Sequence, residues 1–174
     1  MHKRLIALSA LGLATFLAGC GLTPQPEEPA VVAYAEPPPE PTIAQSRAQA
    51  ELECLAKAVY FEARGENEIG QRAVAAVVLN RVRSPDFPNS ICAVVQQGGT
   101  ARRDCQFSWW CDGLSDEPRD TRAWVRAATI AHEMIQGAPD PTNGALYFHS
   151  TRVAPSWRSQ LRRVSTIGAH IYYQ

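Results

Sequence analysis

Two glutamates four residues apart, Glu62 and Glu66, have the residue type and spacing that acid–base chemistry needs. Glu62 comes at the end of a stretch in which apolar residues recur at helical spacing, and a second apolar stretch begins at Ile69. A carboxyl group at the meeting point of two buried helices is poorly hydrated, so it stays protonated above its usual pKa. A general acid needs this property, and Glu62 is therefore our candidate for the acid and base.

Two predicted helices place the candidate at such a junction. Apolar residues between positions 52 and 60 mark one face of a first helix, which should end near Ala63 because Gly65 favours a helix stop. A second helix, capped by Asn67, should run to about Arg83. It is apolar nearly all round, so we expect it to be the central buried helix.

The rest of the domain is predicted to be mixed. Residues 91–95 form a short apolar segment that fits one helical turn or a strand. A third helix is expected from near Pro118 to Gly137. Three strands should follow, at residues 145–149, 162–166 and 170–173. Helices followed by a small antiparallel sheet in the C-terminal part indicate a helix-rich α+β domain.

The residues around Glu62 also carry a family resemblance. The sequence AVYFEARGE at 58–66, with GQ at 70–71 and AVAAVVLNRV at 73–82, resembles the catalytic domain of the SleB-type cell wall hydrolases, the family of the spore-cortex-lytic enzymes. The resemblance extends over roughly residues 50–174. It implies a lysozyme-like architecture and cleavage of peptidoglycan glycan strands, in the best-known members as a lytic transglycosylase. It also aligns Glu62 with the catalytic position of the family.

The implied chemistry leaves alternatives open. A lytic transglycosylase needs one glutamate, which protonates the leaving oxygen and then takes the proton of the muramic acid 6-hydroxyl, giving a 1,6-anhydro product. A two-carboxylate hydrolase, either a muramidase or a glucosaminidase, would need a partner for Glu62, and Glu66, Asp112 and Asp116 are candidates. A non-catalytic wall-binding lipoprotein is another interpretation. An amidase is disfavoured, because no plausible set of zinc ligands stands out.

Several further residues are candidates for binding a glycan. They are Glu66, Gln106, Ser108, Tyr147, His149 and Trp157. Tyr147 and His149 alternate with Phe148 on one predicted strand, so both should face the same side. Trp157 could stack on a sugar ring or cover the core. Glu66 could orient substrate, raise the pKa of Glu62 by like-charge repulsion, or make a capping or buried hydrogen bond.

The N-terminal part is expected to export and anchor the chain. Residues 1–20 combine a basic start with an apolar core too short to span a bilayer, and they end in LAGC, which is typical of a bacterial lipobox. We expect lipid attachment at Cys20, although an ordinary signal peptide is the alternative. Residues 21–46, rich in Pro and Glu, should form a disordered tether before a catalytic domain at 47–174. The protein would then be an exported lipoprotein of the bacterial envelope, facing the periplasm from the outer membrane.

The charge balance and the cysteine count of the chain indicate which binding partners and cross-links to expect. Lys+Arg and Asp+Glu both number 17, and so weak a charge bias argues against nucleic-acid binding. Four cysteines remain besides Cys20, and an even number in an exported domain favours two disulfides, with the pairing left open. We expect peptidoglycan as the polymer partner, no metal or cofactor, and a monomer.

Overall fold

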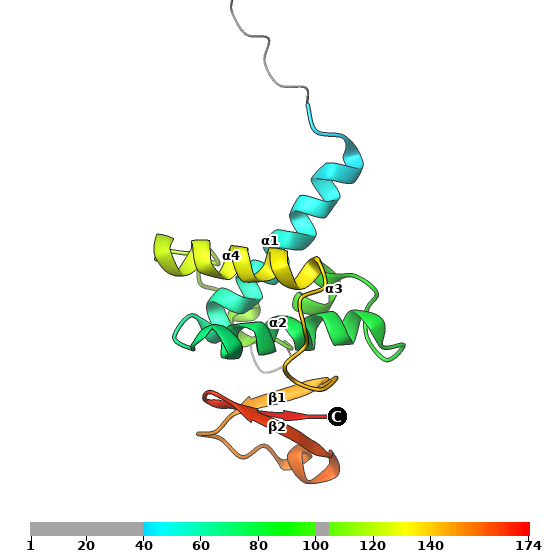
Figure 1. Ribbon diagram of the computed structural model, residues 1–174, viewed down its shortest axis with the longest axis vertical. Helices are drawn as coiled ribbons and strands as arrows, with labels where there is room; N and C mark the ends of the chain where they lie inside the picture. Colours follow the sequence, from blue (N-terminus) through cyan, green and yellow to red (C-terminus); the bar gives the residue numbers. More distant parts are fainter. Residues whose placement is uncertain (1–39, 100–104) are drawn as a thin grey trace, which may run out of the picture. The chain divides into compact units, whose positions relative to one another are not determined.

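The computed structural model describes residues 40–99 and 105–174 (Figure 1). The predicted signal segment 1–20 with Cys20, and the part of the predicted tether before residue 40, lie outside the described residues. Within the described ranges, no helix combines the length and the apolar character that crossing a membrane requires.

Helix α1 (Ile43–Ala63) begins before residue 47, where the domain was expected to start. A capping box explains the earlier start: Thr42 Oγ1 accepts from the Gln45 N–H at 3.3 Å, and Gln45 Oε1 accepts from the Thr42 N–H at 2.8 Å. The helix ends at Ala63, as predicted.

Helix α2 (Glu68–Arg83) is the central helix of the domain. Its first turn is capped by Asn67, whose Oδ1 accepts from the Gly70 N–H at 3.0 Å, as predicted. Every residue from Ala73 to Val78 is buried, which confirms a helix that is apolar nearly all round. Helix α2 packs against α1 and α4 (Thr121–Ile135) on one side and approaches β2 (Arg163–Ile167) on the other, so both of its sides are covered (Figure 1).

Capping residues mark where helices α3 (Ile91–Val95) and α4 begin. Residues 91–95 form the short helix α3, with Ser90 Oγ accepting from the Ala93 N–H at 3.3 Å. Helix α4 starts a few residues later than expected because Asp120 caps it, with Oδ1 accepting from the Ala123 N–H at 3.0 Å. The hydroxyl of Tyr60 accepts from the Asp120 N–H at 3.0 Å and so holds this helix end against α1.

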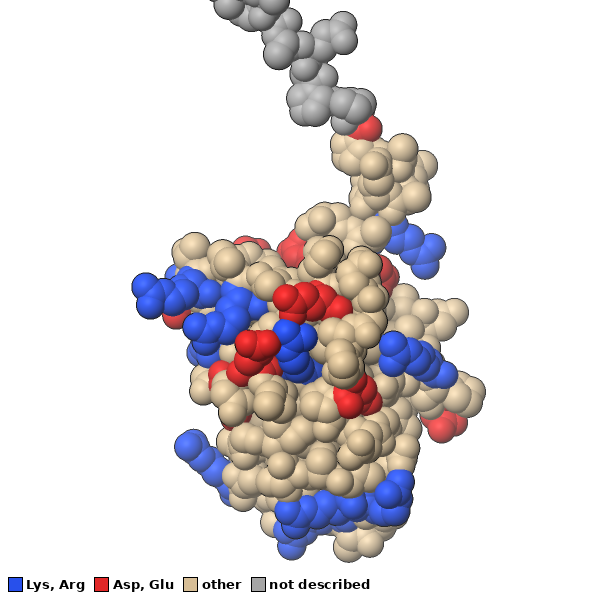
Figure 2. Space-filling model, in the orientation of Figure 1, with Lys and Arg blue, Asp and Glu red and all other residues tan. Residues whose placement is uncertain are grey.

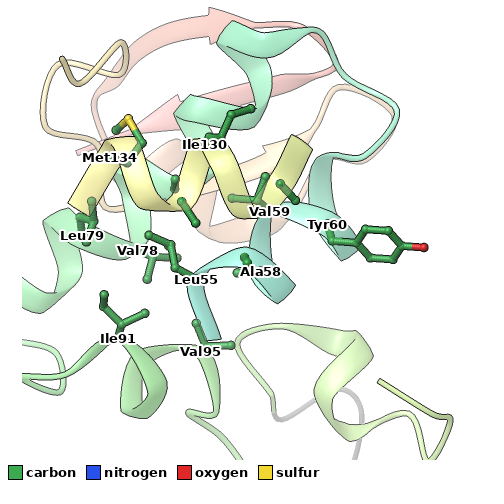
Figure 3. Close-up of a cluster of buried hydrophobic side chains, with 14 of the residues drawn as sticks. Leu55, Ala58, Val59, Tyr60, Val78, Leu79, Ile91, Val95, Ile130 and Met134 are labelled. Atoms are coloured by element: carbon green, nitrogen blue, oxygen red, sulfur yellow. The ribbon is translucent and has the colours of Figure 1, made fainter. Parts of the chain in front are cut away.

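The main hydrophobic core lies between the four α-helices, and Figure 3 shows part of it. Aliphatic side chains from α1, α2, α3 and α4 meet there, with the ring of Tyr60 extending from the edge of the cluster. A second, smaller cluster joins α2 to the sheet through Ala73, Val77, Ala145 and Tyr172. The two clusters position the end of α1 relative to the sheet.

The C-terminal part forms a three-stranded antiparallel sheet in the order β1–β3–β2. Its strands are β1 (Tyr147–Ser150), β2 (Arg163–Ile167) and β3 (His170–Tyr173), close to the predicted ranges. A short 3-10 helix, η3 (Ser156–Gln160), lies between β1 and β2. The predicted helix-rich α+β fold is confirmed.

Two disulfides resolve the pairing that the sequence left open. Cys54–Cys92 joins α1 to α3 with a Cα–Cα distance of 5.2 Å. Cys105–Cys111, with a Cα–Cα distance of 6.2 Å, closes a small loop that contains the 3-10 helix η2 (Ser108–Cys111). The second bridge fixes the segment that carries Trp109, a neighbour of Glu62.

Candidate active site

Glu62 lies in the last turn of α1, at the junction with α2, and its side chain is partly buried. It is neither fully exposed to water nor closed off in the core. Two groups from distant parts of the chain act on its carboxyl, the indole of Trp109 on η2 and the guanidinium of Arg81 on α2. The predicted junction of two helices is therefore present, with two polar groups beside the carboxyl.

Burial raises the pKa of Glu62 from 4.5 to about 7. The Trp109 N–H and the positive charge of Arg81 lower this pKa, but the effect of burial is larger. Near neutral pH, protonated and ionised forms of Glu62 are therefore both well populated. One side chain can then donate a proton and later accept one.

Trp109 contributes an aromatic face and an N–H group. Its ring stacks on Phe61, with centroids 4.7 Å apart and an interplanar angle of 22°. Its buried Nε1–H has no hydrogen-bond partner of ordinary geometry among the described residues, so its effect on Glu62 is that of a nearby dipole. An N–H without another partner is available to donate to the ionised carboxylate.

Arg81 is a buried cation, with 1% of its surface exposed. Its Nε donates to the carbonyl of Leu146 at 2.7 Å. With its amide oxygen turned toward the guanidinium, Gln106 accepts from Nη1 and Nη2, each at 3.1 Å. The guanidinium also lies over aromatic rings, those of Phe87, Phe107 and Tyr147.

Arg81 remains charged despite its burial. Burial lowers its pKa to about 10, and electrostatic interactions with Tyr147 and Glu62 oppose the change. Arg81 therefore stays positive at neutral pH and stabilises the ionised form of Glu62. The sequence alone did not single out this residue, although an arginine within a largely apolar helix, two residues after Leu79 and directly before Val82, was a signal for it.

A hollow of about 410 Å³ opens beside Arg81, which is within the size range of small-ligand sites. Its lining comes from α2, the segment before η2, β1 and the region of η3: Arg81, Gln106, Tyr147, Phe148, Trp157, Gln160 and Leu161. Three of the predicted glycan-binding residues, Gln106, Tyr147 and Trp157, therefore lie together. Glu62 does not line the hollow itself, and its link to this space is the electrostatic contact with Arg81.

Aromatic rings build one side of this hollow. Trp157 is only partly buried, and its ring lies 6.1 Å from that of Tyr147 and 5.6 Å from that of Tyr173. A flat ring held by aromatic neighbours is suited to stacking on a sugar face. Phe61 and Arg64, which are close to Glu62 in the sequence, line a second hollow of about 630 Å³.

Glu66 is occupied elsewhere. Its carboxylate oxygens accept from the Ala169 N–H at 3.2 and 3.3 Å, and Oε1 lies 3.8 Å from Nδ1 of His170. Gly168 has φ 55°, and a Cβ at that position would collide with the Glu66 carboxylate. Of the roles considered for Glu66, this geometry fits a buried hydrogen bond. The bond joins the α1–α2 turn to the β2–β3 turn.

His149 is held by two hydrogen bonds. Nδ1 donates to the carbonyl of Ser150 at 2.8 Å, and Nε2 accepts from the hydroxyl of Tyr173 at 2.9 Å, with the tautomer assigned from these partners. The ring is buried and supports Trp157 edge-on at 5.5 Å. Ser108 is exposed at the start of η2 and does not line the hollow.

Metal chemistry has no candidate ligand set in the described ranges. No group of three or more His, Cys, Asp or Glu side chains among residues 40–99 and 105–174 is arranged to hold an ion. The chemistry that this geometry offers is proton transfer by a carboxyl group beside a cation and a partly aromatic hollow.

The sequence model of the family described as Cell Wall Hydrolase matches residues 65–173, well over half of the chain. The chain belongs to the cell wall hydrolase family. The resemblance drawn from the sequence around Glu62 is thereby confirmed, although the matched range begins just after that residue.

Similar proteins are known in spore-forming bacteria. The spore cortex-lytic enzyme of Bacillus subtilis is 38% identical over 124 residues, which are 70% of this chain and 37% of that protein. That of Halalkalibacterium halodurans is 36% identical over 123 residues, 70% of this chain and 34% of that protein. The chain thus spans about a third of the length of these relatives.

Solved structures of two catalytic domains are also similar. The crystal structure of the catalytic domain of the Bacillus cereus SleB protein has a TM-score of 0.60 and 34% identity, over 72% of this chain and 91% of that one. The catalytic domain of the germination-specific lytic transglycosylase SleB from Bacillus anthracis has a TM-score of 0.59 and 33% identity, over 72% and 95%.

Proposed function

We propose that this protein cleaves the glycan strands of peptidoglycan as a lytic transglycosylase, with Glu62 as its acid and base. The observation that supports this most directly is a partly buried carboxyl with a pKa of about 7, next to the buried cation Arg81. Membership of the cell wall hydrolase family and similarity to a lytic transglycosylase domain support the substrate and the reaction class.

The reaction begins with protonated Glu62. Its proton passes to the glycosidic oxygen as the bond from that oxygen to C1 breaks, which leaves an oxocarbenium-like C1 and an ionised Glu62. Arg81 and the N–H of Trp109 stabilise this carboxylate, because both favour the charged form of Glu62.

Ring closure completes the cycle. The Glu62 carboxylate takes the proton of the 6-hydroxyl on the same muramic acid, and O6 bonds to C1 to give a 1,6-anhydro product. Glu62 is again protonated and no water is consumed. A group whose pKa lies near the working pH is best suited to act first as an acid and then as a base.

The single-glutamate route is favoured by how the other carboxylates are used. Glu66 binds the Ala169 N–H, and Asp112 Oδ1 accepts from the Leu114 N–H at 2.8 Å. Burial, followed by the nearby charge of Asp112, raises the pKa of Asp116. A hydrolase with two catalytic carboxylates is therefore the second choice.

Three residues of the hollow are proposed to bind substrate. Trp157 would stack on a sugar ring, Tyr147 would offer its hydroxyl, and Gln106 would use the amide group that it does not direct at Arg81. Substituting Trp157 by alanine should raise the apparent KM several-fold and leave the pH dependence unchanged, because the side chain does not act on Glu62.

Digestion of purified sacculi tests the reaction. The wild-type protein should release anhydro-muropeptides, one water lighter than hydrolytic products, and Glu62→Gln should release none. Glu117→Gln, at an exposed glutamate, is the matched control and should digest normally. Products with reducing ends would indicate a hydrolase, and binding without release would indicate a wall-binding protein.

We further propose that the chain acts from a membrane to which a lipid on Cys20 holds it, with the segment before α1 as spacer. Substitution of Cys20 by serine should then move the protein from the membrane fraction to the soluble fraction, with its activity on sacculi retained. Equal membrane association of both forms would contradict the lipid anchor.

A further inference from the structure

The charges of this domain are unevenly distributed along the chain. Residues 141–174 contain four arginines and neither aspartate nor glutamate, whereas residues 40–140 contain 14 Asp+Glu against 11 Lys+Arg. The sheet region is therefore positive and the helical region slightly negative. Figure 2 shows basic side chains along the end of the domain that carries η3 and β2, with no acidic side chain beside them on that face.

These four arginines lack carboxylate partners within the described part of the chain. Arg152, Arg158, Arg162 and Arg163 are all exposed. Arg162 contacts Gln174 Oε1 and Arg163 contacts Thr166 Oγ1, and both of these groups are neutral. By contrast, Arg72 on α2 pairs with two glutamates. The sheet region thus offers guanidinium groups whose charges are not neutralised.

Two of these arginines are adjacent in sequence to residues that line the hollow beside Arg81. Arg158 belongs to η3 and comes directly after Trp157, while Arg162 follows Leu161. Trp157, Gln160 and Leu161 all line the hollow, so Arg158 and Arg162 alternate with its lining residues. A polymer lying in the hollow would bring its side branches close to both guanidinium groups.

We propose that Arg158 and Arg162 bind the free carboxylates of the peptide stems that branch from the glycan, and so direct the protein to strands with acidic stems. This inference rests on the proposed function for the identity of the polymer. The guanidinium fork suits carboxylates because it can donate two parallel hydrogen bonds to them. An anionic lipid surface is less suitable, since Arg158 and Arg162 alternate with residues of a recessed hollow and not with a continuous exposed apolar face.

The test compares two substrates that differ in charge. Sacculi are N-acetylated, and half of them are then amidated with carbodiimide and methylamine, which neutralises the carboxylates and keeps the glycan intact. Co-sedimentation with the Glu62→Gln protein measures binding without cleavage. At low ionic strength the acetylated sacculi should bind about fivefold more tightly, as expected for two exposed charge contacts. At about 0.15 M salt this preference should shrink.

The double variant Arg158→Gln/Arg162→Gln should bind both substrates alike. The matched control, Arg122→Gln/Arg126→Gln, removes two exposed arginines from α4 and should keep the preference. Thermal melts establish that both variants fold. Equal binding of the two substrates by the Glu62→Gln protein, or equal loss in both double variants, would overturn the proposal.

Vesicles of phosphatidylglycerol and phosphatidylethanolamine provide a further comparison. Binding to vesicles that depends on Arg158 and Arg162, without preference between the two kinds of sacculi, would overturn the proposal in favour of a membrane surface. The proposed cleavage is tested separately, with the protein in which Glu62 is intact. If that protein releases no muropeptide, the proposed cleavage is wrong. The sedimentation ratio still decides the role of the arginines in that case.

Discussion

The raised pKa of Glu62 predicts a change in stability when this side chain is replaced by glutamine. The glutamine keeps the shape of the side chain and removes its titration. At a pH below 4.5 the wild-type carboxyl is protonated in the folded and the unfolded states. As the pH rises toward 7, the unfolded chain releases this proton first and the folded protein is destabilised. The stability associated with Glu62 is thus present at low pH and is lost as the pH rises through about 7.

The size of the effect follows from the two pKa values. A rise from 4.5 to about 7, at about 1.4 kcal/mol per pH unit, corresponds to about 3 kcal/mol. Between about pH 4 and about pH 8, Glu62→Gln should therefore gain about 3 kcal/mol in its free energy of unfolding relative to the wild-type protein. Titrating groups distant from Glu62 contribute equally to both proteins and cancel in the difference.

Urea unfolding at several pH values, followed by circular dichroism, measures this difference. Glu117→Gln removes an exposed carboxyl and should track the wild-type protein at every pH. If Glu62→Gln also tracked the wild-type protein, the carboxyl would be hydrated in the folded state. The acid–base role proposed for Glu62 would then lose its physical basis.

Three further predictions concern the surroundings of Glu62 and the stability of the domain. Trp109→Phe keeps a ring beside Phe61 but removes the N–H that lowers the pKa of Glu62. The alkaline limb of the pH–rate profile should therefore move to higher pH by as much as about one unit. An unchanged profile would show that the indole does not act on Glu62. Gly168→Ala forces a Cβ into the Glu66 carboxylate at φ 55° and should cost about 1–3 kcal/mol in thermal or urea unfolding, whereas Gly65→Ala, with no atom within 4 Å of its added Cβ, should cost much less. Equal losses would mean that Glu66 can leave the hairpin freely. Replacing Cys54 and Cys92 by serine opens a loop with a sequence separation of 38, and unfolding should become easier by about 4 kcal/mol; a loss below about 1 kcal/mol would show that packing alone holds α3 against α1.

The C-terminal sheet region supplies most of the lining of the hollow beside Arg81, although it carries neither Glu62 nor Arg81. Tyr147, Trp157 and Leu161 come from β1, η3 and the segment just after η3. Arg81 reaches them because α2 lies against the sheet and its Nε bonds the carbonyl of Leu146. Coupling between the helical and sheet regions is therefore expected to matter for binding as well as for stability.

Local sequence signals predicted the elements well. The end of α1 at Ala63, the Asn67 cap of α2 and the span of β3 each depend on residues within a few positions of one another. Caps were also where the prediction failed: Thr42 started α1 early, and Asp120 started α4 late. Both residues are good caps by type, but several nearby polar residues could have filled the same role, so residue type alone did not identify the cap.

By itself, the sequence determined the helix-rich α+β character of this protein, its family, and the position of Glu62 at a helix junction. These follow from periodicity and short motifs, which involve neighbouring residues. Only the tertiary structure decided that Arg81 is the cation beside Glu62, that Glu66 binds the hairpin at Ala169, and that Cys54 pairs with Cys92. Each of these contacts joins residues far apart in the chain, so it depends on how the helices pack against one another and against the sheet, which no local pattern encodes.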